Sequence, residues 1–106
     1  MDVKEISKLP SKEILDGFKA KLIHTENVTF SYVTIKANAI LPEHSHFQEQ
    51  ITQVTEGKLE MTIDGVTKIL QPGMVAIIQS NSKHSGKALT RCKVIDIFCP
   101  VREDYK

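Results

Sequence analysis

The chain lacks the sequence features typical of a membrane-spanning protein, of a secreted protein and of a nucleic-acid-binding protein. No apolar run in its 106 residues approaches the roughly 18 residues of a membrane-spanning helix. The opening MDVKEISKLPSKEI is charged throughout, unlike a secretory signal peptide. Its 14 basic and 13 acidic residues are mixed, without the basic stripe that binds nucleic acid. We therefore expect a cytoplasmic protein with no membrane or nucleic-acid partner.

Cysteine is also scarce, and the sequence has no linker, internal repeat or low-complexity segment. Cys92 and Cys99 lie seven residues apart, so on one strand they would point to opposite faces and could not bridge each other. Free thiols agree with a cytoplasmic location. A chain of this length forms one domain, which we expect to span residues 1–106.

Strand signals dominate the remaining sequence, and helical signals are nearly absent. Asp64-Gly65 lies between apolar alternations, which is a strong hairpin signal. A short turn or a single helical turn is predicted in Ser11–Gly17, capped by Ser11 and ended by Gly17. We expect seven or eight short strands, typical of a sandwich or barrel. The segments richest in β-branched and apolar residues are 28–37, 51–70, 72–79 and 92–101.

The stretch PEHSHFQEQ, residues 42–50, contains two of the four histidines. On one regular strand His44, His46 and Gln50 would point to the same side. Neutral imidazole is a common ligand for transition metals, so the pattern is typical of half a metal shell. Glu49 has the opposite parity and becomes the alternative ligand only if a bulge turns it inward. Two surface histidines that fall close together by chance are the other interpretation.

A second unusual feature is the carboxylate in CKVIDIFCPV. Asp96 shares one strand face with Val94 and Phe98, while Ile95 and Ile97 share the other. Both faces are apolar, so we expect both to be buried. An interior Asp is costly unless it is paired or linked to a metal, which makes Asp96 a candidate functional residue. A structural pairing with an Arg, or the capping of a turn, is the alternative.

The spacing around the histidine pair resembles the first motif of the cupin superfamily. His44, His46, Gln50 and Gly57 match its two histidines, its Glu or Gln and its following glycine. Asn38 replaces the leading glycine of the motif. Asn is among the few residues that adopt a left-handed backbone readily, so this departure is mild.

The second cupin motif is matched by Gly73 and, eleven residues later, His84. Gln79, Asn81 and Ala88 depart from the usual proline, glycine and asparagine. The resemblance spans about residues 35–99. It implies an all-β cupin fold, the double-stranded β-helix or jelly-roll barrel. It also implies one divalent metal ion (Zn, Ni, Mn or Fe), held by two histidines and Gln50 from one strand and by a histidine from a facing strand. The ligand set is thus His44, His46, Gln50 and His84, whereas His24 has no partner in either motif.

The ending FCPVREDY, residues 98–105, is similar to that of the KdgF-type cupins of pectin and alginate degradation. This resemblance implies an enzyme that converts 4,5-unsaturated uronate monosaccharides to linear 5-keto-4-deoxyuronate. Asp96, Phe98 and Arg102 match the active-site positions of that family. The implied roles are proton transfer for Asp96, packing against the sugar for Phe98 and binding of the substrate carboxylate for Arg102.

Two other functions are compatible with the same residues. A non-catalytic cupin would bind a metal or a small acidic sugar without turning it over, and an iron-dependent dioxygenase would use a related ligand set. We also expect a homodimer, because many cupins pair through strands and the segment VTFSYV, residues 28–33, is apolar.

Overall fold

The computed structural model describes residues 1–106 and is built almost entirely of strands. Ten strands and two short 3-10 helices follow one another along the chain. In order these are η1 (Ile6–Lys8), β1 (Lys12–Leu15), β2 (Phe18–His24), β3 (Thr29–Ile35), β4 (Ile40–His44), β5 (Glu49–Glu56), β6 (Leu59–Ile63), β7 (Val66–Leu70), β8 (Val75–Ile78), β9 (His84–Ala88), β10 (Cys92–Cys99) and η2 (Glu103–Tyr105).

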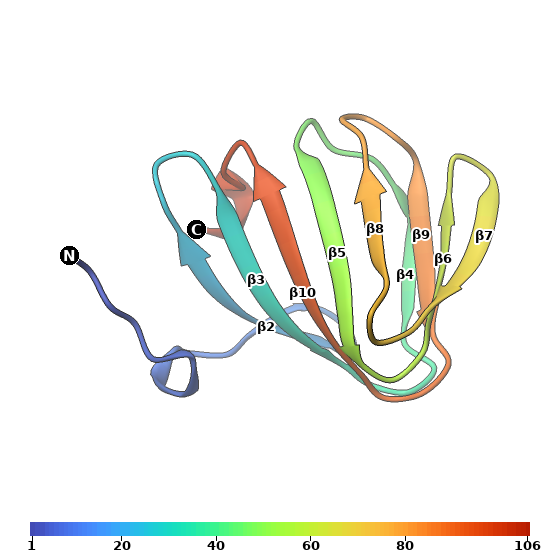
Figure 1. Ribbon diagram of the computed structural model, residues 1–106, viewed down its shortest axis with the longest axis horizontal. Coiled ribbons are helices and arrows are strands. Elements are labelled where there is room, and N and C mark those ends of the chain that lie inside the picture. The colour runs from blue at the N-terminus through green and yellow to red at the C-terminus, as the bar shows by residue number, and fades with distance from the viewer.

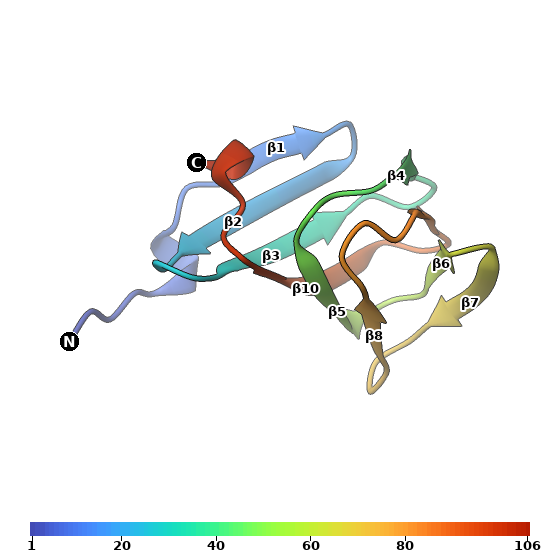
Figure 2. The same ribbon diagram turned by 90° about the horizontal axis from the view of Figure 1, so that it is seen from above.

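The strands form two antiparallel sheets that enclose the interior (Figures 1 and 2). The larger sheet has the order β1-β2-β3-β10-β5-β8, and the smaller has the order β4-β9-β6-β7. The predicted all-β jelly-roll barrel is therefore confirmed, although with more strands than the seven or eight expected. No helix has the length and apolar character needed to cross a membrane.

The predicted helical turn at Ser11–Gly17 is wrong. This segment instead forms β1, which pairs with β2 through a turn at Asp16-Gly17. Gly17 adopts a left-handed φ of 84°, which suits a tight chain reversal. A four-residue segment gains little from a helix, because the first helical turn is costly to nucleate. Pairing with β2 satisfies its backbone groups instead.

Other turn predictions are confirmed. Asp64 and Gly65 have φ values of 48° and 82°, as the two-residue hairpin between β6 and β7 requires. Asn38 and Asn81 have φ values of 68° and 65°. Both therefore adopt the left-handed backbone for which the cupin motifs use glycine, so the departures in sequence leave the loops intact.

The interior is divided along the strands into an apolar end and a polar end. The apolar end contains most of a core of 12 buried residues, among them Ala20, Val33, Ile35, Val54 and Val94. Along β10 the inward side chains then change from Val94 to Asp96 and Phe98, whose cross-strand neighbours are polar. Those neighbours are Ser31, Thr52, Thr29 and Gln50. The outer face differs from expectation, because Ile95 and Ile97 are only half-buried there.

Gly57 links the two sheets where β5 turns into β6, and this position excludes any side chain. Its φ is 86°, and a Cβ there would collide with the Arg91 carbonyl oxygen and lie 2.6 Å from the Thr90 hydroxyl. Gly65 has nearly the same φ, 82°, but a Cβ there would meet no atom within 4 Å. Substitution at Gly65 therefore tests the cost of the left-handed backbone alone, whereas substitution at Gly57 adds the cost of a steric overlap.

We predict that Gly57→Ala destabilises the fold far more than Gly65→Ala. The left-handed backbone costs each variant about 1–2 kcal/mol, and the overlap with the Arg91 carbonyl adds roughly 1–3 kcal/mol only at Gly57. Urea unfolding of both variants would measure the difference in free energy of unfolding. Equal losses would show that the contact with Arg91 relaxes without cost.

Candidate metal centre

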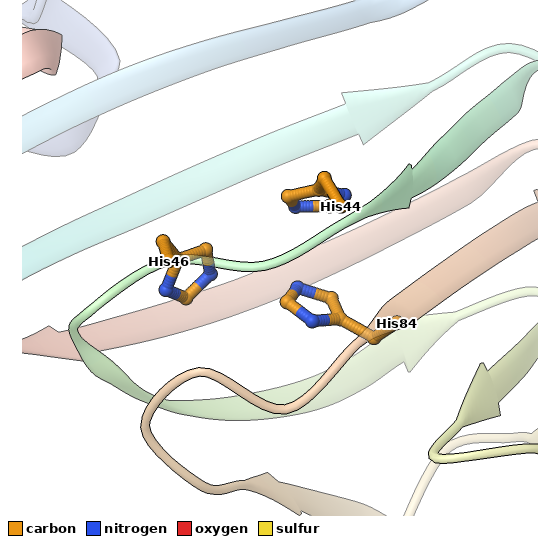
Figure 3. Close-up of side chains that lie close together, drawn as sticks. All are labelled: His44, His46 and His84. Carbon is orange, nitrogen blue, oxygen red and sulfur yellow. The ribbon is translucent and has the colours of Figure 1, made fainter.

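Three histidines from two neighbouring strands and a loop meet at the polar end of the barrel (Figure 3). His44 ends β4, and His84 begins β9 directly opposite it in the strand register. His46 lies in the loop between β4 and β5. The expected common strand for His44, His46 and Gln50 is therefore wrong, because β4 ends at His44 and Gln50 belongs to the opposite sheet. The strand contributing His84 is the neighbour of β4 rather than a facing strand.

The three imidazole rings are close enough to share one ion. One ring nitrogen from each lies within 4.8 Å of the others. The ring centroids of His44 and His84 are 4.2 Å apart, and those of His46 and His84 are 5.0 Å apart. The loop of His46 is tied to that of the second motif, because the backbone N–H of Asn81 donates to the His46 carbonyl at 2.8 Å.

Main-chain carbonyls fix which nitrogen of each ring carries the proton. The Nδ1 atoms of His44, His46 and His84 each lie 2.9 Å from a carbonyl oxygen, those of Pro42, Gln48 and Ser82 respectively. A carbonyl can only accept, so each Nδ1 donates. In the neutral ring each Nε2 then keeps a lone pair, which is the arrangement in which histidine binds a metal.

Burial favours the neutral form of His46 and His84. It lowers the pKa of His46 and of His84, because a charged imidazolium is poorly solvated inside the barrel. For His46 the nearby Arg102 guanidinium lowers the pKa further, while contacts with Gln50 and Gln48 raise it in part. Neutral imidazole is the form that ligates metals, so both rings are ready to bind at neutral pH.

Gln50 reaches the same site from β5, with its amide orientation set by its neighbours. Its Nε2 donates to Thr52 Oγ1 at 2.9 Å and to Asp96 Oδ1 at 3.3 Å. Its Oε1 is thereby turned to within 2.9 Å of His46 Nε2. Glu49 is exposed and lies on the other face of β5, so the geometry favours Gln50 over Glu49 as the ligand.

This donor set fits a divalent cation. His46 Nε2 and Gln50 Oε1 present lone pairs to each other at 2.9 Å, an arrangement that a shared cation makes favourable. His84 Nε2 is buried without any hydrogen-bond partner, and such groups are costly unless something binds them. Imidazole nitrogens with one amide oxygen suit Zn, Ni, Fe or Cu. When bound, the ion would act as a Lewis acid toward a ligand oxygen.

Asp96 lies beside this centre and not within it. Its carboxylate lines a cavity inside the barrel that His44, Gln50 and His84 also line. It accepts a hydrogen bond from Thr52 Oγ1 at 2.8 Å, besides that from Gln50. Burial raises its pKa to about 6, although the hydrogen bonds from Thr52 and Gln50 oppose this shift. Asp96 can thus exchange a proton near neutral pH. Gln50 connects it directly to the histidine cluster.

Arg102 and Phe98 line the cavity near Asp96. The Arg102 guanidinium lies 4.8 Å from the Phe98 ring centroid and 4.0 Å from that of Tyr105. Burial alone would lower the pKa of Arg102, but hydrogen bonding to Asp104 raises it overall, so the group stays cationic. Six of the seven site residues predicted from the sequence thus line this cavity. The seventh, His46, belongs to the histidine cluster and contacts Gln50.

Three residues around the cavity were not predicted. Thr52 shares the inward parity of Gln50, which was the available signal. Tyr105 and Asp104 belong to the ending that resembles the KdgF-type cupins, which was the available signal, but the resemblance assigned them no role at the cavity. His24, which had no assigned partner, lies away from the cluster and its Nδ1 contacts Thr29 Oγ1 at 2.8 Å. Both cysteines are free, as expected.

The arrangement matches a known family in sequence and in structure. The model of the Cupin domain family matches residues 31–98. This chain belongs to the cupin family. It is 32% identical to the pectin degradation protein KdgF of Dickeya dadantii over 99 residues, which cover 91% of this chain and 90% of that protein.

Solved cupin structures extend the similarity. The structure of KdgF from a Halomonas species superposes with a TM-score of 0.89 at 26% identity and covers 94% of each chain. An RmlC-like cupin from Shewanella frigidimarina superposes with a TM-score of 0.92 at 24% identity, covering 97% of this chain and 94% of that one. The latter shows the fold alone. The resemblance to KdgF-type cupins inferred from the sequence is thus confirmed.

We predict that His44→Ala removes bound metal, while His24→Ala retains it. Loss of one converging Nε2 leaves two imidazoles and an amide, a poorer set of ligands. Elemental analysis of both variants, purified alongside the wild type, would measure the occupancy and identify the metal. The melting temperature of metal-free His44→Ala should fall only modestly, since the barrel core supplies most of the stability. Full occupancy in His44→Ala would contradict the assignment.

Proposed function

We propose that this cupin is a metal-dependent enzyme that opens the ring of 4,5-unsaturated uronate monosaccharides and gives linear 5-keto-4-deoxyuronates. The observation that carries the proposal is the position of Asp96. A partly buried carboxylate with a pKa of about 6 shares one cavity with His44 and His84 of the histidine cluster and with Arg102. The relationship to the pectin degradation protein KdgF supports a uronate as the substrate.

The proposed reaction is an isomerisation and needs no redox partner. Asp96 accepts the proton of the hydroxyl on carbon 1, and the bond between carbon 1 and the ring oxygen breaks. An aldehyde forms at carbon 1, and the released oxygen on carbon 5 becomes part of an enolate. Asp96 then delivers the same proton to carbon 4, so that the enolate becomes a ketone at carbon 5. A carboxyl group with a pKa near the working pH suits both transfers.

Other residues of the chain would hold the substrate during these steps. Arg102 is a planar, permanently charged donor that can bind the substrate carboxylate through two hydrogen bonds. Phe98 offers an apolar surface at the cavity against which the sugar can pack. The cation at the histidine cluster would polarise a substrate oxygen. Because Gln50 is neutral, the cation would keep its full positive charge for an anionic substrate.

We predict that Asp96→Asn lowers turnover by about two to four powers of ten, the usual contribution of general acid–base catalysis. Asn keeps an oxygen to accept from Thr52, so fold and metal content should be retained. Disappearance of the ultraviolet absorbance of the conjugated double bond, in lyase digests of pectin and alginate, measures turnover. Asp16→Asn, at an exposed turn, is the matched control. A variant that melts early but turns over normally would assign Asp96 a structural role.

The same residue predicts the pH profile of the wild type. The base form of Asp96 is lost as the pH falls below its pKa of about 6, so turnover should decline below that value.

A non-catalytic cupin would bind metal and uronate at neutral pH without any change in absorbance. That outcome would replace the proposed enzyme with a binding protein.

We also propose that the chain forms a homodimer through the outer face of the larger sheet. Five apolar residues there are direct cross-strand neighbours over β2, β3, β10, β5 and β8, and form an outer stripe. They are Ile23, Phe30, Ile97, Ile51 and Ile77. Ile77 is 67% exposed and Ile51 is 37% exposed. A straight apolar stripe can pair with its own copy about a two-fold axis.

We predict that Ile51→Lys makes the protein monomeric, because a dimer would bury an unpaired charge within the stripe. Val66→Lys is the control, since Val66 is equally apolar and 59% exposed but lies on the smaller sheet. Sedimentation velocity over a range of concentrations would measure the oligomer. A monomeric wild type would refute the homodimer.

A further inference from the structure

The short C-terminal helix η2 folds back onto Arg102. The chain leaves β10 at Cys99, and the Arg102 backbone N–H donates to Thr29 Oγ1 at 2.9 Å. Residues Glu103–Tyr105 then turn, so that Asp104 and Tyr105 both contact the guanidinium. In Figure 2 this C-terminal turn lies next to β1 and β2. The Arg102 side chain is only 10% exposed, whereas that of Asp104 is 61% exposed.

The two hydrogen bonds to Asp104 occupy one edge of the Arg102 guanidinium and do not involve the other edge. Nε donates to Asp104 Oδ1 at 3.0 Å, and Nη2 donates to Asp104 Oδ2 at 2.8 Å. Arginine has five N–H donors in a rigid fork, and these two bonds occupy its side edge. The end edge, formed by Nη1 and the second hydrogen of Nη2, remains for another acceptor. Arg102 lines the cavity, so a ligand carboxylate can bind this edge without displacing Asp104.

Two aromatic rings fix the plane of the same group. The Arg102 guanidinium contacts the rings of Phe98 and Tyr105, whose planes are perpendicular and whose centroids are 5.8 Å apart. Cation–π contacts of this kind favour a set position of the charge. The guanidinium is therefore held by a carboxylate along one edge and by aromatic rings, before any ligand arrives.

We propose that Asp104 is a positioning residue that turns the end edge of Arg102 into the cavity and thereby sets how an organic carboxylate binds. This inference rests on the proposed function for the identity of the substrate, a uronate. It adds Asp104, which lies at the exposed side of the pair, to the residues that determine its recognition. The opposing possibility is that Asp104 competes with the substrate carboxylate for Arg102.

The kinetic test uses the full-length, metal-loaded protein and an unsaturated uronate. Asp104→Asn should raise KM about tenfold or more, the effect of losing a charge-assisted hydrogen bond, while kcat changes less than about threefold. Glu103→Gln is the matched control, because this exposed carboxylate pairs only with Lys106, and it should leave KM unchanged. Asp104→Glu, which keeps the carboxylate, should recover part of the lost affinity. A KM that falls in Asp104→Asn would show competition and overturn the proposal.

A double-mutant cycle separates positioning from general damage to the fold. Lysine has no side edge for Asp104 to hold, so Asp104→Asn should have no further effect on KM in an Arg102→Lys background. If the two changes raise KM independently, Asp104 does not act through Arg102 and the proposal is wrong.

A ligand-free measurement keeps this inference distinct from the proposed function. In nitrogen–proton correlation spectra the Nε–H of Arg102 should exchange slowly with water in the wild type and in Glu103→Gln. It should exchange fast in Asp104→Asn. Failure of uronate turnover with this pattern intact would refute the proposed reaction alone. Fast exchange already in the wild type would show that Asp104 does not keep a stable hydrogen bond with Arg102 Nε, and would refute the proposal.

Discussion

The candidate site depends on the hydrogen bond between each histidine Nδ1 and a main-chain carbonyl. These bonds, to Pro42, Gln48 and Ser82, do two things at once. They fix the tautomer, so that every Nε2 has a free lone pair, and they fix the direction in which each ring points. Without them the imidazoles would rotate or share protons with one another. Because the carbonyls belong to the ends and connections of strands, the precision of the site derives from the barrel itself.

Gln50 joins the histidine cluster to Asp96. An amide has both a donor and an acceptor, and here each faces a different partner. The acceptor faces His46, and the donor faces Thr52 and Asp96. A single side chain thus connects the histidine cluster with the hydrogen bonding of Asp96. Thr52 completes the arrangement, since it accepts from Gln50 and donates to Asp96.

Much of the fold could be predicted from the sequence, because strand composition and turn residues are local properties. The Asp64-Gly65 hairpin is an example. β1 was missed because a capping Ser and a Gly are shared by helical turns and by hairpins, and only pairing with β2 decides between them. The ligand residues came from motif spacing, yet the reasoning that placed His44 and His46 on one strand was wrong. Alternation alone does not tell where a strand ends.

The C-terminal residues show the limit of such reasoning more clearly. Asp96 could be identified from the sequence because a carboxylate is unusual among the apolar residues of a strand. The residue types of Asp104 and Tyr105 are not unusual where they occur, since acidic and aromatic residues are common in exposed tails. Their relation to Arg102 arises from the three-residue turn of η2 and from the anchoring of the Arg102 backbone on Thr29. The ending FCPVREDY marks these positions as part of a family pattern, but their contacts with Arg102 are tertiary and required the structure.

The choice of Gln over Glu at position 50 follows from the neighbouring carboxylate. Gln50 Nε2 lies 3.3 Å from Asp96 Oδ1 and donates to it. A Glu at this position would place an oxygen there instead, and two anionic groups at such a distance in a buried site repel strongly. One of them would be forced to hold a proton. The neutral amide avoids that conflict, and it leaves Asp96 with a pKa set mainly by burial. The cupin motif accepts either residue, and in this chain the amide donates a hydrogen bond to Asp96 that a carboxylate at position 50 could not donate.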